Sequence, residues 1–318
     1  MTPGFVSEWT NEPGTFEDLL ADARTLGFPA TKRLVHDWIA LGLLDHPKRR
    51  SKGRAGGSDK ALFPASQRNL FRLLVQKRPE VKTIAGMCGV PVALWLWWGD
   101  EYAPTSQVQR ALSTWAGQVS KVSWQTVRRH ARQATDFIDD LGASRDERQH
   151  LIDLLARIAY SGKLPDEGEL ARAVTEVFDP ARSGRAFGSR LATATAGFLV
   201  TLIAGRLRGM ERIRQRASFE ELERARAIYR DTRMQWAKER ADLAQDLLRP
   251  KDATLFKPET LQDLFDGACS ELMLIIGLLA RAPSNTTSSG QQTSAPGAAQ
   301  TARGLTTGGI GPHGEQAT

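Results

Sequence analysis

The chain has 318 residues, of which 41% are hydrophobic and 25% charged, and these values are typical of a folded globular protein. Its formal net charge of +7 favours an acidic partner such as nucleic acid or an anionic membrane surface. The N-terminus lacks the cationic start and apolar core of a secretory signal. The longest apolar run, residues 191–205, is shorter than the ~20 residues of a membrane span. We therefore expect a buried helix there and a cytoplasmic, nucleoid-associated protein.

The positive charge is concentrated in one segment. Residues 32–82 carry 13 Lys or Arg against 4 Asp or Glu, a local charge of +9, whereas the rest of the chain is slightly acidic. This segment is therefore expected to hold whatever binds an anion.

Two short helices are predicted at the start of this region. Thr15 is a candidate N-cap for a first helix, which Gly27 and Pro29 end. Thr31 is a candidate N-cap for a second helix that ends at Gly42. The apolar face of the second helix comprises Leu34, Val35, Trp38 and Leu41, and its other face carries Lys32, Arg33, His36 and Asp37.

A basic, glycine-containing stretch follows the second helix, "HPKRRSKGRAGGSDKALFP" at residues 46–64. It holds six cations between Lys48 and Lys60 and stops at Phe63, where a third helix, residues 66–78, is expected. Its place between two helices favours a β wing over a flexible linker. A phosphate-binding loop is disfavoured because the stretch has no Gly-Lys-Ser/Thr signature.

The sequence "LLADARTLGFPATKRLVHDWIALGLLDHPKRR" followed by "ALFPASQRNLFRLL" resembles the DNA-binding domain of MerR-type regulators. The landmarks are Gly42-Leu43-Leu44, Pro47, Arg49 and Phe63, over about residues 15–80. The resemblance implies a winged helix-turn-helix and a dimer on a two-fold symmetric operator. It makes Arg33 and His36 recognition-helix contacts, and Arg49 and Arg50 wing contacts.

The candidate DNA contacts combine this resemblance with the charge pattern. Long cationic side chains at the start of a helix can reach base edges in the major groove, and cations on a wing can neutralise phosphates. The recognition-helix candidates are Thr31, Lys32, Arg33 and His36, and the wing candidates are Lys48, Arg49, Arg50, Lys52, Arg54 and Lys60.

The rest of the chain is expected to be helical. Short helices are predicted over residues 81–102, where Trp95, Trp97 and Trp98 form either core or a ligand-binding cage. Residues 219–248 form the longest uninterrupted helical stretch, either a core helix or a dimerising one. The last residues, 283–318, are too polar to bury a core and are expected to be disordered.

The fold class expected is mainly α: an N-terminal winged helix-turn-helix with a small β wing, an all-helical domain and a disordered tail. The domains expected are a flexible N-terminus, 1–14, a DNA-binding domain, 15–104, a helical dimerisation or sensor domain, 105–282, and the tail, 283–318.

Other kinds of site have weaker support. Cys88 and Cys269 lack metal-ligand spacing and are expected to be reduced, buried thiols. The five histidines are scattered, so no metal or other cofactor is expected.

The function that the sequence favours is sequence-specific binding of double-stranded DNA by a homodimeric transcriptional regulator without enzymatic activity. Three alternatives stay open: a plasmid or phage replication, transfer or excision factor with the same fold, an enzyme or ligand-binding protein with a site in the helical domain, and an assembly adaptor that acts through residues 219–248 and the tail. No motif in the sequence identifies the operator or the effector, or distinguishes an activator from a repressor.

Overall fold

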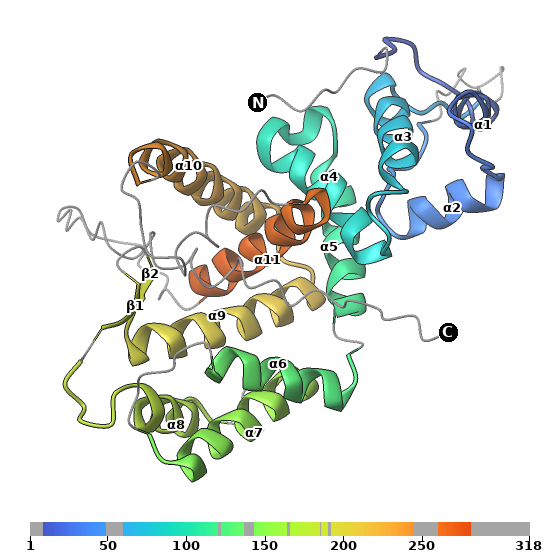
Figure 1. The fold of residues 1–318 in the computed structure, drawn as a ribbon. Helices are drawn as coiled ribbons and strands as arrows, with labels where there is room; N and C mark the ends of the chain where they lie inside the picture. The colour runs from blue at the N-terminus through green and yellow to red at the C-terminus, as the bar shows by residue number, and fades with distance from the viewer. Residues whose placement is uncertain are drawn as a thin grey trace. The chain divides into compact units, whose positions relative to one another are not determined.

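The computed structural model describes residues 9–48, 60–119, 122–136, 143–163, 166–184, 186–189, 192–243 and 260–280, and these are mainly helical (Figure 1). The chain divides into two compact units, one comprising residues up to Trp115 with Leu264–Cys269, the other Ala116–Asp263 with the residues from Ser270 onward. The α-helices are α1 (Phe16–Thr25), α2 (Lys32–Ala40), α3 (Ala65–Lys77), α4 (Ile84–Trp98), α5 (Thr105–Val119), α6 (Trp124–Asp136), α7 (Arg145–Ser161), α8 (Glu167–Phe178), α9 (Ala196–Arg214), α10 (Phe219–Leu243) and α11 (Leu261–Leu279); a 3-10 turn, η1 (Gly99–Glu101), follows α4.

The two predicted N-caps are confirmed. The Thr15 hydroxyl accepts a hydrogen bond from the Asp18 backbone N–H, and the Asp18 carboxylate accepts one from the Thr15 N–H at 2.7 Å, so α1 begins with a capping box. These bonds to the charged carboxylate lower the pKa of Asp18. The Thr31 hydroxyl caps α2 by accepting from the Leu34 N–H at 3.2 Å. Gly27 and Gly42, which follow the two helices, both have the positive φ that favours glycine.

The core of the first unit gathers the apolar faces of α1, α2 and α3. Val35 and Trp38 of α2 are buried as predicted, and Ile39 is buried with them. The Trp38 ring lies 5.6 Å from that of Phe71 on α3, a separation typical of favourable aromatic pairs. The burial of this face leaves the opposite face of α2 exposed.

The prediction of short helices over residues 81–102 was wrong, because α4 is one continuous helix that contains Pro91. Thr83 caps its start by accepting from the Gly86 N–H at 3.0 Å, and Gly99 follows its end with a φ of +71°. Ten of the 15 residues of α4 are buried, among them Pro91 and its neighbours, and this apolar burial offsets the backbone hydrogen bond that Pro91 cannot donate.

The second unit has a core built from α7, α8 and α9, including Leu154, Leu170, Val174 and Leu199. It also contains a short antiparallel pair, β1 (Phe187–Ser189) and β2 (Ala192–Ala194). The helix expected over residues 191–205 therefore starts late.

The start of α9 has a local physical cause. Thr195 caps the helix by accepting from the Phe198 N–H at 3.2 Å, and a capping residue must itself be extended rather than helical. None of the helices in the described ranges is both long and apolar enough to cross a membrane. The predicted disordered tail, residues 283–318, lies outside the described residues.

Candidate nucleic-acid interface

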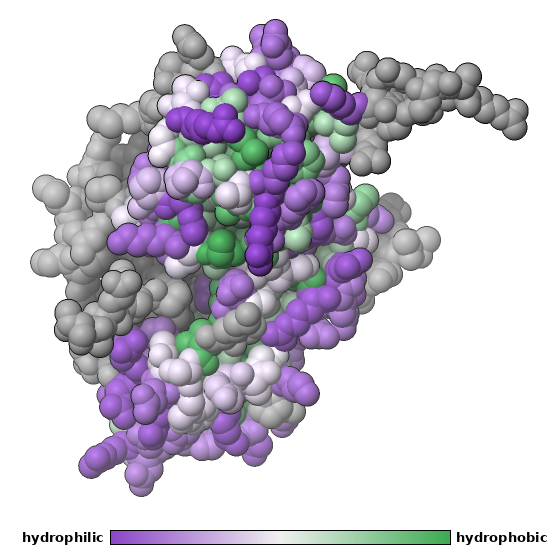
Figure 2. Space-filling model, turned by 90° about the vertical axis from the view of Figure 1, so that its right-hand side faces the viewer, coloured by the Kyte–Doolittle hydropathy of each residue, from purple (hydrophilic) through white to green (hydrophobic). Residues whose placement is uncertain are grey.

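The exposed face of α2 carries the recognition-helix candidates. Thr31, Lys32, Arg33 and His36 are all exposed, whereas Val35 and Trp38 on the other side are buried. Figure 2, which faces the side of α1 and α2 in Figure 1, shows hydrophilic side chains as the prevailing kind on this face. The helix thus presents donors to solvent from a rigidly packed backbone.

Two of these side chains contact α1. The Lys32 ammonium lies 2.6 Å from a Glu17 carboxylate oxygen, with both side chains largely exposed. The hydrogen bond from Lys32 is the main reason that the pKa of Glu17 is lowered. The His36 ring lies 4.8 Å from the Phe16 ring at a shallow interplanar angle of 31°, so the imidazole rests against an aromatic surface of α1.

An antiparallel bridge follows α2. The backbone groups of Lys48 and Leu62 exchange two hydrogen bonds, at 2.8 and 2.9 Å, and Gly14 and Phe63 form a second bridge, at 3.0 and 2.7 Å. Phe63 is fully buried and packs edge-on against Phe16 at 5.0 Å, which fixes this paired backbone to the core. Lys48 and Lys60 are exposed beside it. The other wing candidates, Arg49, Arg50, Lys52 and Arg54, lie outside the described residues.

A polar network holds the loop between α2 and the bridge. The Gln67 side chain of α3 accepts from the Asp45 N–H at 2.7 Å and donates to the Gln107 side chain at 2.8 Å. Gln107 of α5 donates in turn to the Leu43 carbonyl at 2.9 Å, and Arg110 pairs with Asp45 at 2.8 Å. Both glutamines are essentially buried, so each lost bond would leave a costly unpaired polar group.

Gly42 allows this loop to lie against α5. Its φ is +79°, and a Cβ atom there would overlap the backbone nitrogen of Ala111. The sequence predicted Gly42 as a helix stop, and the structure adds a close approach between backbones. A side chain at this position would displace the residues that lead to the bridge.

A partly buried ion pair joins α1 to α3. Arg68 donates two hydrogen bonds to Asp22, at 2.6 and 3.0 Å, and both side chains are mostly shielded from solvent. The bonds to Asp22 raise the pKa of Arg68. Bidentate geometry of this kind fixes orientation as well as adding energy, so the two helices that flank α2 are held in register.

Sequence reasoning missed the supporting residues, although one signal was present. Gln67 stands at the spacing of Leu70, Phe71 and Leu74, the buried face of α3. A polar side chain at an apolar register must find a partner, and this marks Gln67 as structurally important. Its partners, Asp45 and Gln107, are far away in sequence and could not be named from it.

The tryptophans of the "ALWLWW" run do not converge on a common cage. Trp95 is buried and its indole N–H donates to the Thr105 hydroxyl at 3.2 Å, whereas Trp97 and Trp98 are exposed. Cys88 and Cys269 are free and buried, as expected, and burial raises the pKa of Cys88 to about 12. Their thiols are consequently poor nucleophiles at neutral pH.

No protein-family model, no curated protein and no solved structure matches this chain. The functional argument therefore depends on the geometry of the first unit.

Proposed function

We propose that the first unit binds double-stranded DNA through the exposed face of α2 and the segment that follows it, and that the protein regulates transcription. The observation that carries the proposal is the order of elements. A capped helix, a tight turn and a second capped helix with an exposed cationic face are followed by the backbone bridge between Lys48 and Leu62. A winged helix-turn-helix requires this order of elements, and in the described residues the place of its wing holds a single backbone bridge and no strand.

The dimensions of α2 suit a recognition helix. Its nine residues span about 13 Å at 1.5 Å per residue, and the major groove of B-DNA admits an α-helix. Recognition helices contact base edges with residues near their N-termini, which is where Thr31, Lys32, Arg33 and His36 lie. Arg33 has the donor pattern that pairs with the O6 and N7 atoms of guanine.

The segment between the two bridge partners, Lys48 and Leu62, supplies the phosphate contacts in this proposal. Lys48 and Lys60 are exposed at its two ends, and Arg49, Arg50, Lys52 and Arg54 lie between them in the sequence. Cations of this kind neutralise phosphates and release counterions, which accounts for affinity but not for sequence preference. The resemblance to MerR-type regulators adds a homodimer and a two-fold symmetric operator to the proposal.

A salt titration of DNA binding tests it. The full chain is titrated with fluorescent duplexes at several salt concentrations, and the slope of log affinity against log salt is measured. Each lost phosphate contact reduces that slope by roughly 0.9, so a variant with alanine at Lys48, Arg49, Arg50, Lys52 and Arg54 should lose most of the salt dependence. Alanine at Lys32, Arg33 and His36 should instead weaken discrimination between sequences.

The control removes two exposed lysines outside the proposed contacts, Lys82 and Lys238, a smaller change of charge than the five cations of the wing variant. Binding by this control should stay close to that of the unmodified chain. If duplex DNA does not bind at low salt, or if the wing variant and the control behave alike, the proposal is wrong.

Genome-wide mapping of binding sites separates regulation from the alternative role in plasmid or phage DNA processing. Sites at promoters support a regulator, whereas a single cluster at a replication or transfer origin supports the alternative. The spacing of half-sites in the mapped motif also tests the proposed dimer, because one helical turn of DNA is 10–10.5 base pairs.

A further inference from the structure

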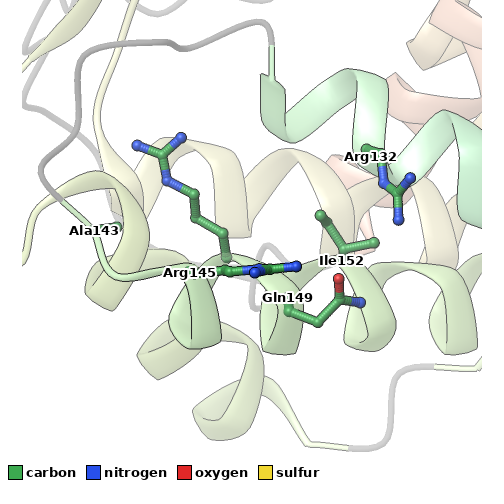
Figure 3. A pocket seen from close by; sticks show the side chains of 6 residues that line it. Arg132, Ala143, Arg145, Gln149 and Ile152 are labelled. Atoms are coloured by element: carbon green, nitrogen blue, oxygen red, sulfur yellow. The ribbon is translucent and has the colours of Figure 1, made fainter.

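A cavity of about 530 Å³ lies between α6 and α7 in the second unit. Figure 3 shows Arg132 reaching from α6 toward Gln149 and Ile152 of α7, with Ala143 just before α7. Its size falls within the range of small-molecule sites, about 300–1,000 Å³. The complete described lining is Arg132, Ala143, Arg145, Arg148, Gln149 and Ile152.

Three guanidinium groups give this cavity a strong positive charge. No acidic side chain is among the described residues that line it, and Asp146 and Glu147 lie beside these arginines in the first turn of α7. Glu147 accepts from the Ser144 N–H at 2.7 Å in the capping box of α7, and these bonds lower its pKa. Asp153 accepts from Arg128 at 3.2 Å and from Gln149 at 2.9 Å.

The start of α7 adds to this potential. Arg145 and Arg148 lie in its first turns, where the helix dipole is positive and acidic residues are favoured. Asp146 and Glu147 in the same turn offset part of the repulsion that these two cations meet there, and a bound anion would offset more of it. The three guanidiniums around one cavity carry this argument, and the helix end only reinforces it.

An apolar floor accompanies the cations. Ile152 is 5% exposed and packs with Ala131 of α6 and Ala156 of α7. The cavity therefore offers an apolar surface beside a cluster of donors, a combination that suits an organic molecule with one charged group.

We propose that this cavity binds a phosphate-bearing small molecule, with the phosphate on Arg132, Arg145 and Arg148 and the remainder of the molecule against Ile152 and Ala143. Phosphate is preferred to a single carboxylate because it carries nearly two charges and enough acceptor oxygens for several guanidiniums. The proposal stands independently of DNA binding by the first unit.

Calorimetry on the full chain tests it with three probes: inorganic phosphate, adenosine 5′-monophosphate and unphosphorylated adenosine. The monophosphate should bind more tightly than inorganic phosphate, because it also covers the apolar floor, and adenosine should not bind measurably. Arg145→Gln combined with Arg148→Gln should weaken the monophosphate about 100-fold, since each lost charge-assisted bond costs about tenfold or more.

Two further variants keep the test decisive. Arg132→Gln probes the cavity from the other helix and should weaken binding about tenfold. Arg157→Gln removes an exposed cation of α7 that pairs with Glu169 outside the cavity lining, and it should leave affinity unchanged. Thermal unfolding confirms that each variant is folded before it is titrated.

Several outcomes would overturn the proposal. These are an absence of phosphate or monophosphate binding at millimolar concentration, equal binding by the double variant and the unmodified chain, and equal losses in Arg157→Gln and Arg132→Gln. Loss of duplex DNA binding in the double variant, with no binding of the monophosphate by the unmodified chain, would assign these arginines to nucleic acid instead.

Discussion

Both units present clusters of cations, but they present them on surfaces of different form. In the first unit Lys32, Arg33 and His36 stand on the exposed face of one helix. In the second unit Arg132, Arg145 and Arg148 surround a cavity between two helices. An exposed helix face can enter a groove of a large polyanion, whereas an open pocket between two helices offers its cations to a small anion. The same residue types therefore lead to different proposals for the two units.

The two clusters also differ in how they are supported. Behind the face of α2 lie a glycine turn and a buried polar network, in which Gln67 and Gln107 each make several bonds. Below the arginines of the cavity lies apolar packing between Ile152, Ala131 and Ala156. Polar networks fix one geometry but fail sharply when a member is lost, and apolar contacts tolerate more change. The first surface should therefore be the more sensitive of the two to single substitutions in its support.

The largest expected effect follows from Gly42→Ala. The substitution forces a positive φ on a residue with a Cβ and pushes that atom into the backbone of Ala111, so unfolding should become easier by about 3 kcal/mol or more. Gly27→Ala is the control, because Gly27 also has a positive φ but has open space around it, and it should lose only about 1 kcal/mol. Urea unfolding followed by tryptophan fluorescence measures both. Equal losses would show that the approach to α5 does not matter.

Gln107→Leu tests the polar network at nearly constant volume. The Leu43 carbonyl loses its donor from Gln107, and one bond of Gln67 is lost, so we expect a destabilisation of about 2 kcal/mol and weaker DNA binding. Gln118→Leu changes an exposed glutamine on the same helix and should do neither. Full DNA affinity in a destabilised Gln107→Leu chain would show that the polar network stabilises the fold but does not affect DNA binding. The proposed sensitivity of the first surface to its polar support would then be wrong.

Glu17→Gln should strengthen DNA binding a few-fold. It removes the carboxylate that holds the Lys32 ammonium and leaves that cation available to a phosphate, so the salt slope should steepen by at most about 0.9. Glu80→Gln is the control, since it releases Lys77, which is less exposed than Lys32, from a surface pair outside the proposed interface. An equal gain in both variants would mean that net charge alone, and not the face of α2, sets the affinity.

The local features of the first unit were predictable from the sequence. Thr15, Thr31 and Gly42 were identified correctly as helix ends, because caps and stops depend on residues within one turn. The buried and exposed faces of α2 followed from its apolar spacing in the same way. The predicted small β wing is not shown, because the described residues between α2 and α3 form among themselves a single bridge, between Lys48 and Leu62, with no strand.

The features that depend on distant residues were not predictable. The partners of Gln67 come from the turn after α2 and from α5, and the cavity needs Arg132 of α6 beside Arg145 of α7. The α4 helix passes through Pro91 because the residues around Pro91 are buried, which is a property of the fold and not of the local sequence. These features thus depend on tertiary packing, which the local sequence does not specify.

The smallest effect concerns the pH dependence of stability in the second unit. The pKa of His130 on α6 is lowered, first by burial and then by the nearby Arg129. As the pH falls below about 6.5, the unfolded chain takes up a proton that the folded protein resists. The stability contributed by the neutral imidazole is therefore complete above that pH and is lost as the pH falls toward the lowered pKa.

His130→Gln should flatten the decline of stability in this pH window, as measured by urea unfolding at a series of pH values. The exposed His150 on α7 provides the control, and His150→Gln should leave the decline nearly intact. His130 precedes Ala131, which packs on Ile152 at the floor of the cavity, so the measurement reports on the part of α6 that contacts α7. Parallel pH curves for the unmodified chain and His130→Gln would show that this contact tolerates a charge. In that case the apolar packing below the cavity would tolerate a charge as well as substitutions, which would widen its difference from the polar network of the first unit.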